Sequence, residues 1–278
     1  MSKNILSIND IRQAYARSEN LVKLLSEQGD LDRDGVIEIA YDIQSGSYTK
    51  TALSNPGSLQ RYAQDIHDLC TQFISENDLI LDCGAGELTT LSALSMDLPA
   101  HTRLVACDIS LSRLRVGRRF AERFMRGDLA RKLDLFVADM GCMPLADRCM
   151  DVVITSHALE PNHGREAILI RELLRIARRY LILLEPSWEN ATEAVRCRME
   201  EHGYVRDLPR HISEAGGRLI SVEPLPHQLN PMNPTYCYIV EVADQFTPRE
   251  GDDLFFQCPR SGFPLQKYSN YLWSLFYL

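Results

Sequence analysis

Two glycines between a buried strand and a helix, with an aspartate further along the chain, have the clearest chemical use. Residues 79–87, LILDCGAGE, turn from an apolar strand through Gly84, Ala85 and Gly86 into a helix, and Asp108 ends an apolar run 22 residues after Gly86. Because glycine has no side chain, this backbone can approach a ligand closely, and the helix start beyond it offers N–H groups to an anionic group. A carboxylate ending the second strand is placed to accept both hydroxyls of a ribose. Together these residues predict a pocket for an adenosine-type ligand.

The elements that must position these residues follow from the pattern between about residues 59 and 185, which alternates helical periodicity with short apolar runs. Helices are expected over 59–73 after a Ser58 cap, from Leu88 onward, after a Ser110 cap, and over 170–177. Strands are expected at residues 79–81, 104–107, 135–137, 152–154 and 180–184, and two later β-rich runs at 218–222 and 236–242 predict an antiparallel pair at the sheet's edge. The expected fold class is α/β: a doubly wound, mostly parallel sheet with an antiparallel closing strand.

The kind of ligand is narrowed by two positions in the glycine turn. A dinucleotide fingerprint would have its third glycine where this chain has Thr89, which argues against a pyrophosphate-binding dehydrogenase. Asp82, just before the glycines, suits a ligand with a positive charge and an amino group. Over residues 59–185 the chain resembles the class I S-adenosylmethionine-dependent methyltransferases, most closely the small-molecule group with a type-11 methyltransferase domain. The resemblance implies a Rossmann-like methyltransferase fold and S-adenosylmethionine as the cofactor.

The resemblance also implies roles for particular residues. Residues 81–86 would cradle the methionyl part of the cofactor, and Asp108 would hold the ribose. Asp139, after the third strand, would meet the adenine amino group, and Met140 would cover the ring. The loop within residues 151–160 would line the transferred methyl. The residues expected to bind the cofactor are Tyr48, Asp82, Gly84, Ala85, Gly86, Asp108, Ile109, Asp139, Met140 and Ser156.

The catalytic candidates lie in the loop after the fourth strand. Methyl transfer is an in-line displacement, so holding the acceptor behind the methyl is the main task, although an unactivated hydroxyl also needs a base. His157 is the leading candidate for that base, with Glu160 and His163 nearby. His157 has a second use, shaping the cofactor pocket by hydrogen bonding, and the sequence favours this one. Residues 185–188, after the fifth strand, are also placed to meet the acceptor.

The two ends of the chain differ from the middle. Residues 1–57 read as a helical lid or lead-in, in which Tyr41 and Tyr48 are candidates to cover the methionyl end of the cofactor. Residues 58–245 form the expected S-adenosylmethionine-binding methyltransferase domain. Residues 246–278 form an aromatic C-terminal tail that is expected to pack on the same chain or on a partner, a homo-oligomer being one option.

Composition bounds the partners. Lys plus Arg number 30 against 38 Asp plus Glu, for a net charge of -8, so neither nucleic acid nor an anionic membrane is expected as a general partner. No apolar run approaches the ~20 residues that span a bilayer, the first residues lack a secretory core, and the eight cysteines form no close pair. We therefore expect a cytoplasmic enzyme that methylates an oxygen or nitrogen of a small polar biosynthetic molecule, with a sugar-containing acceptor preferred.

Other interpretations stay open. Basic residues recur from Arg113 to Lys132, which is most typical of a solvated helix face but would also serve an RNA or protein methyltransferase as a docking surface. A non-catalytic, cofactor-binding partner subunit is a further alternative, and a nicotinamide dehydrogenase is the most distant.

Overall fold

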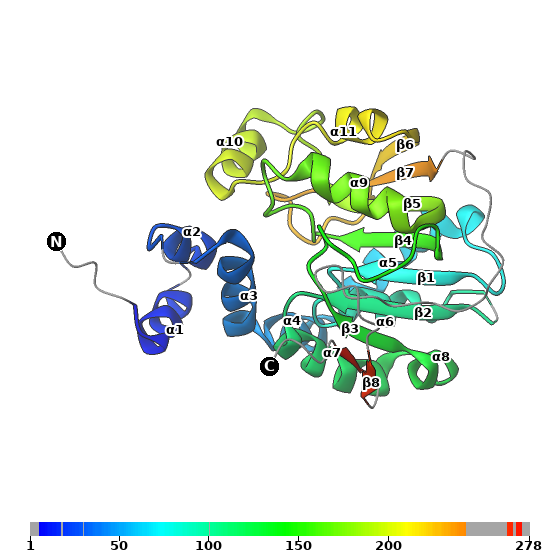
Figure 1. Ribbon diagram of the computed structural model, residues 1–278, viewed down its shortest axis with the longest axis horizontal. Coiled ribbons are helices and arrows are strands. Elements are labelled where there is room, and N and C mark those ends of the chain that lie inside the picture. Colours follow the sequence, from blue (N-terminus) through cyan, green and yellow to red (C-terminus); the bar gives the residue numbers. More distant parts are fainter. Residues whose placement is uncertain are drawn as a thin grey trace.

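The computed structural model describes residues 6–17, 19–29, 31–99, 101–242, 266–268 and 271–273. Nine strands of this described chain form one sheet in the order β6-β7-β5-β4-β1-β2-β3-β9-β8 (Figure 1). The strands are β1 Leu79–Cys83, β2 Arg103–Asp108, β3 Asp134–Val137, β4 Met150–Ser156, β5 Ala177–Pro186, β6 Gly217–Pro224, β7 Thr235–Val242, β8 Gln266–Tyr268 and β9 Tyr271–Trp273. Strands β1 to β5 run parallel, whereas β7 pairs antiparallel with both β5 and β6. The predicted α/β sheet with an antiparallel closing pair is confirmed.

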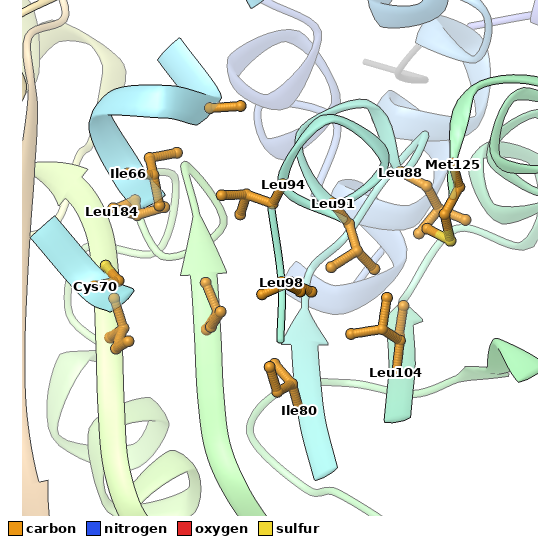
Figure 2. Close-up of a cluster of buried hydrophobic side chains, with 14 of the residues drawn as sticks. Ile66, Cys70, Ile80, Leu88, Leu91, Leu94, Leu98, Leu104, Met125 and Leu184 are labelled. Carbon is orange, nitrogen blue, oxygen red and sulfur yellow. The ribbon is translucent and has the colours of Figure 1, made fainter. Parts of the chain in front are cut away.

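Both faces of the central sheet are buried, because neighbouring strand residues point to opposite sides. Ile80 and Leu104 pack on one side against α5 Pro56–Cys70, α6 Thr89–Leu94, α7 Leu111–Phe124 and α8 Gly127–Lys132. Figure 2 shows part of this cluster, with Ile66 and Cys70 of α5 and Leu91 and Leu94 of α6. On the other side, Leu81 and Val105 pack against α9 Glu166–Ile176 and α11 Leu208–Glu214. With helices on both faces, the crevice for a ligand lies at the carboxyl ends of the parallel strands.

The N-terminal segment consists of α1 Ile8–Ala16, α2 Leu21–Ser26, α3 Arg33–Gln44 and α4 Ser47–Ser54. Ile11, Leu21, Leu25 and Val36 are buried in a small core that α1, α2 and α3 share. Figure 1 shows α1 and α2 away from the sheet, while α3 and α4 return to it and pack beside α7. Only the last two helices of this segment therefore reach the crevice.

Some local predictions need correction. Ser58 does not cap the helix over 59–73: α5 begins at Pro56, and the side chain of Asn55 accepts from the Ser58 N–H. Proline fits the first helical position because the missing N–H has no partner there anyway. Ala177 belongs to β5 rather than to the helix before it. The Ser110 cap of α7 is confirmed, since its hydroxyl accepts from the Arg113 N–H.

A 3-10 turn, η1 Thr71–Phe73, follows α5, and α10 Glu193–His202 lies between β5 and α11. Within the described ranges, every helix is too short or too polar to traverse a lipid bilayer. The predicted aromatic tail lies outside the described residues apart from the backbone of β8 and β9. There β9 pairs parallel with β3, and β8 pairs antiparallel with β9.

Candidate functional site

The turn after β1 depends on glycine. Gly84 has φ +76° and Gly86 φ +52°, the left-handed region that favours glycine. The N–H groups of Gly84 and Ala85 both donate to the Cys107 carbonyl at 2.9 Å, which ties the turn to β2. A Cβ atom on Gly84 would overlap that of Ala158, in the loop after β4. The turn therefore brings two loops together at one edge of the sheet, and no other residue type fits at this position.

Two carboxylates lie beneath and beside this turn. Asp108 accepts from the Gly86 N–H at 2.8 Å through Oδ2 and from the Ser110 N–H at 2.9 Å through Oδ1. Each oxygen keeps a second lone pair for a ligand hydroxyl. Asp82 is only 5% exposed, and its Oδ1 has no hydrogen-bond partner. Burial, with a smaller contribution from the neighbouring Asp108 charge, raises the pKa of Asp82 to about 7. A ligand cation would relieve this buried, under-satisfied carboxyl.

A cavity opens above the turn, with a volume of about 730 Å³ that includes its solvent-filled mouth. Of the residues predicted to bind the cofactor, the cavity is lined by Tyr48, Gly84, Asp108, Ile109, Asp139, Met140 and Ser156. Asp82, Ala85 and Gly86 belong to the strand end and turn that support it. The structure thus brings seven of the ten predicted cofactor residues together around one space.

Asp139 and Met140, the residues predicted for adenine, both line the cavity. Asp139 accepts from the Gly141 N–H at 3.0 Å and from Arg165 Nη2 at 3.2 Å. The methyl of Met140 lies 3.2 Å from where a Gly84 Cβ would stand, so Met140 borders the glycine turn. Arg165 also lines the cavity, although the sequence did not single it out.

The loop after β4 holds His157 firmly. His157 Nδ1 lies 2.7 Å from Glu160 Oε2, and Nε2 lies 2.7 Å from the Thr235 hydroxyl at the start of β7. Asn233 Nδ2 donates to the same Glu160 oxygen at 2.8 Å. Burial lowers the pKa of His157, but the charge and hydrogen bond of Glu160 and the charge of Glu185 outweigh it, so the net pKa is raised. His157 lines the cavity and is the described histidine best placed to act as a proton acceptor.

Glu185 supports this loop rather than meeting an acceptor, which corrects the expectation for the first of residues 185–188. Its carboxylate is fully buried and accepts from the Thr155 hydroxyl at 2.8 Å and from the N–H groups of Ala158 and Leu159 at 3.0 and 3.1 Å. Burial raises the pKa of Glu185 to about 7, although the His157 charge and these hydrogen bonds oppose the shift. Removing Glu185 would therefore release the loop that carries His157.

The other two catalytic candidates do not line the cavity. Glu160 reaches it through His157, as described above. His163 points elsewhere: its side chain is 47% exposed and pairs with Glu166 at the start of α9, at 2.8 Å. His163 is thus separated from the residues it was grouped with.

Helices α3 and α4, from the segment predicted to be a lid or lead-in, contact α7 and the residues next to the glycine turn. Glu87 accepts from the Gly46 N–H at 2.8 Å and from the Thr49 N–H at 2.7 Å, which anchors the start of α4. The Arg113 guanidinium lies between the rings of Tyr41 and Tyr48, 4.8 Å from each centroid. Arg113 is therefore a cavity residue, and its assignment to a solvated basic face is wrong.

Comparison with known proteins agrees with this geometry. Residues 81–181 match the family model described as a methyltransferase domain. No curated protein matches the chain. A solved S-adenosylmethionine-dependent methyltransferase from Aquifex aeolicus is 16% identical, with a TM-score of 0.51 over 64% of this chain and 89% of its own.

Two further solved structures are similar. The magnesium protoporphyrin IX methyltransferase of Synechocystis PCC 6803, with bound S-adenosylhomocysteine, is 14% identical, with a TM-score of 0.53 over 67% of this chain and 84% of its own. A Haloferax volcanii putative methyltransferase, in complex with the Trm112 methyltransferase activator, is 15% identical, with a TM-score of 0.56 over 72% of this chain and 98% of its own. At this identity the solved structures show the fold.

The cavity lies at the carboxyl edge of the parallel strands, which is where α/β sheets of this kind bind nucleoside ligands. Residues 81–181 match a methyltransferase domain, and the fold around them is that of solved S-adenosylmethionine-dependent methyltransferases.

Proposed function

We propose that this methyltransferase acts on an oxygen or nitrogen of a small polar molecule, with a sugar-containing acceptor preferred. The observation that carries the proposal is the pair His157–Glu160, in which His157 lines the cavity and Glu160 lies 2.7 Å behind it. An unactivated hydroxyl or an ammonium must lose a proton as the new bond forms, and this pair is placed to take it.

The residues present fit the cofactor. Asp82 has an orphaned oxygen for the amino group, Asp108 has free lone pairs for the ribose hydroxyls, and Asp139 borders the expected adenine position. When bound, S-adenosylmethionine supplies a methyl group on a positively charged sulfur. The net negative charge of the buried carboxyls at this edge suits that cation.

His157 and Glu160 would orient the acceptor and take its proton. A neutral His157 that donates from Nδ1 to Glu160 leaves Nε2 as the hydrogen-bond acceptor, where the Thr235 hydroxyl now sits. In the proposal, the acceptor O–H or N–H takes over that place, and its proton moves to Nε2. The carboxylate of Glu160 then stabilises the imidazolium.

The proposal favours a small acceptor over RNA because the basic face is weaker than the sequence suggested. Arg113 is buried, Arg118 donates to the Leu133 carbonyl at 3.0 Å, and Arg126 donates to the Leu98 carbonyl at 2.8 Å. Guanidiniums held on backbone oxygens are less available to phosphates. The net charge of -8 acts in the same direction.

The test is transfer of a radioactive methyl group. The full chain would be incubated with methyl-labelled S-adenosylmethionine and, in separate reactions, a pool of sugar-containing and amine-containing metabolites, bulk RNA, or mixed protein. We expect label in the small-molecule pool, and much less with an Asp108→Ala variant. Label in RNA or protein alone would contradict the proposal, and cofactor binding without transfer to any pool would favour the non-catalytic partner subunit.

A further inference from the structure

The guanidinium of Arg113 lines the cavity and has no carboxylate partner among the described residues. Arg113 lies in the first turn of α7 and is 8% exposed. Its guanidinium carbon would stand 2.7 Å from a Cβ on Gly86, so the group rests directly on the glycine turn. Its Nε is buried without a hydrogen-bond partner, and across the described chain its guanidinium takes part in no ion pair within 4 Å. A buried guanidinium with five donors and no acceptor is costly unless a ligand completes it.

The nearby carboxylates do not fill this role. Both oxygens of Asp108 are directed to the N–H groups of Gly86 and Ser110, and Glu87 is directed to those of Gly46 and Thr49. Their charges still act on Arg113 through space and favour its charged form. The group therefore remains a cation in the lining of the cavity.

The glycine turn itself has few donors left for an anion. The N–H groups of Gly84 and Ala85 are taken by the Cys107 carbonyl, and that of Gly86 is taken by Asp108. The cofactor has one anionic group, the carboxylate of its amino-acid end. With Asp82 available for the adjacent ammonium, the carboxylate would lie at the same end of the cavity, where the turn cannot bind it.

We infer that Arg113 binds the carboxylate of S-adenosylmethionine and is the residue that distinguishes the complete cofactor from adenosine compounds lacking that group. The inference rests on the assignment of the cofactor to this cavity. A guanidinium suits the task because its planar fork matches a carboxylate with two parallel hydrogen bonds.

Tyr41 and Tyr48 give Arg113 a second role. Their rings stack on the guanidinium from α3 and α4, so the same cation that meets the carboxylate also holds the lid helices. The lid residues thus position Arg113, and a bound carboxylate would in turn fix the lid.

The experiment compares two ligands on matched variants of the full chain. S-adenosylmethionine and its decarboxylated form differ only in the carboxylate, and both keep the ammonium and the sulfonium. Their dissociation constants would be measured by calorimetry on the wild type, on Arg113→Met and on Arg113→Lys. Arg115→Met, an exposed arginine two residues further along α7, is the control.

We expect Arg113→Met to bind S-adenosylmethionine about 10- to 100-fold more weakly, as for a lost charged hydrogen bond, and the decarboxylated form nearly as well as the wild type. Arg113→Lys should lie between, and Arg115→Met should match the wild type. If Arg113→Met does not fold, Arg113→Lys decides, because it keeps the charge without the planar fork and should lose part of the preference for the complete cofactor.

Equal affinity of the wild type for both ligands, or an equal loss for both in Arg113→Met, would overturn the inference while leaving the cofactor assignment intact. A wild type that binds neither ligand would overturn both. The acceptor proposal is tested separately by methyl transfer.

Discussion

Replacing Asp82 with asparagine should weaken cofactor binding and remove most of its pH dependence. The pKa of Asp82 is raised from 3.8 to about 7 by burial and by Asp108. Only the ionised form attracts the ammonium of the ligand, and a group of pKa 7 is about 10% ionised at pH 6 and about 90% at pH 8. The wild type should therefore bind S-adenosylhomocysteine about tenfold more tightly at pH 8 than at pH 6. The Asp82→Asn variant, which carries no charge at this position, should show little slope and about 10- to 100-fold weaker binding at pH 8.

The same substitution, which weakens cofactor binding, should reduce the loss of stability that the free protein suffers as the pH rises. Because the folded-state pKa of Asp82 is raised, the folded protein holds this proton more tightly than the unfolded chain does. The free wild type should therefore lose stability as the pH rises from about 4 to about 7, and Glu185, whose pKa is also raised to about 7, adds to this loss. Asp82→Asn should make the free energy of unfolding depend less steeply on pH. The dependence that remains should come from Glu185.

The assays are calorimetric titration at pH 6, 7 and 8, and thermal unfolding without ligand. Asp151→Asn is a matched control, since Asp151 is also buried but lies near the opposite end of the sheet, where it accepts from the Leu79 N–H at 2.9 Å. The control should lower the melting temperature and leave both the affinity and its pH slope unchanged. A tenfold slope that persists in Asp82→Asn would refute the reasoning.

Four further predictions concern the rest of the site. Asp108→Ala should weaken S-adenosylhomocysteine binding by about 1–3 kcal/mol in a calorimetric titration, through lost charge-assisted hydrogen bonds, and unchanged affinity would remove its ribose role. His157→Ala should lower the rate of label transfer about 10²-fold or more while cofactor affinity stays similar, and a normal rate would dismiss His157 as the base. Because the pKa of His157 is raised, a rate that needs its neutral form should rise with pH up to a point above the ordinary histidine range near 6.5, and a flat profile would contradict this. Gly84→Ala should abolish cofactor binding and destabilise the fold, because φ +76° costs about 1–2 kcal/mol for alanine and the new Cβ overlaps that of Ala158; a stable variant that binds normally would count against the turn geometry.

The position of the cofactor residues could be predicted because it follows from topology. Asp82 and Asp108 each lie near the carboxyl end of a parallel strand, and those ends share one edge of the sheet. The cap of α7 at Ser110 is a local signal, and the structure confirms it. The cap predicted at Ser58 is wrong, because Asn55 caps the helix and Pro56 begins it. Apolar periodicity, which begins at Leu59, gives no signal for these two polar or cyclic residues.

The residues that sequence reasoning missed depend on contacts between distant segments. Thr235 lies 78 residues from His157, and its contact requires β7 to insert antiparallel beside β5, a register that no local pattern specifies. Arg113 was counted with its basic neighbours as part of a solvated face. Its place three residues after the Ser110 cap puts it in the first turn of α7, at the ligand edge of the sheet, and this signal was available.

The central claim, that the cavity at the carboxyl edge holds S-adenosylmethionine, is tested most directly by a crystal structure of the full chain with S-adenosylhomocysteine. The account predicts density with the ribose on Asp108, the amino group on Asp82 and the purine beside Asp139. Ligand density elsewhere on the molecule, or a ribose that does not touch Asp108, would contradict it.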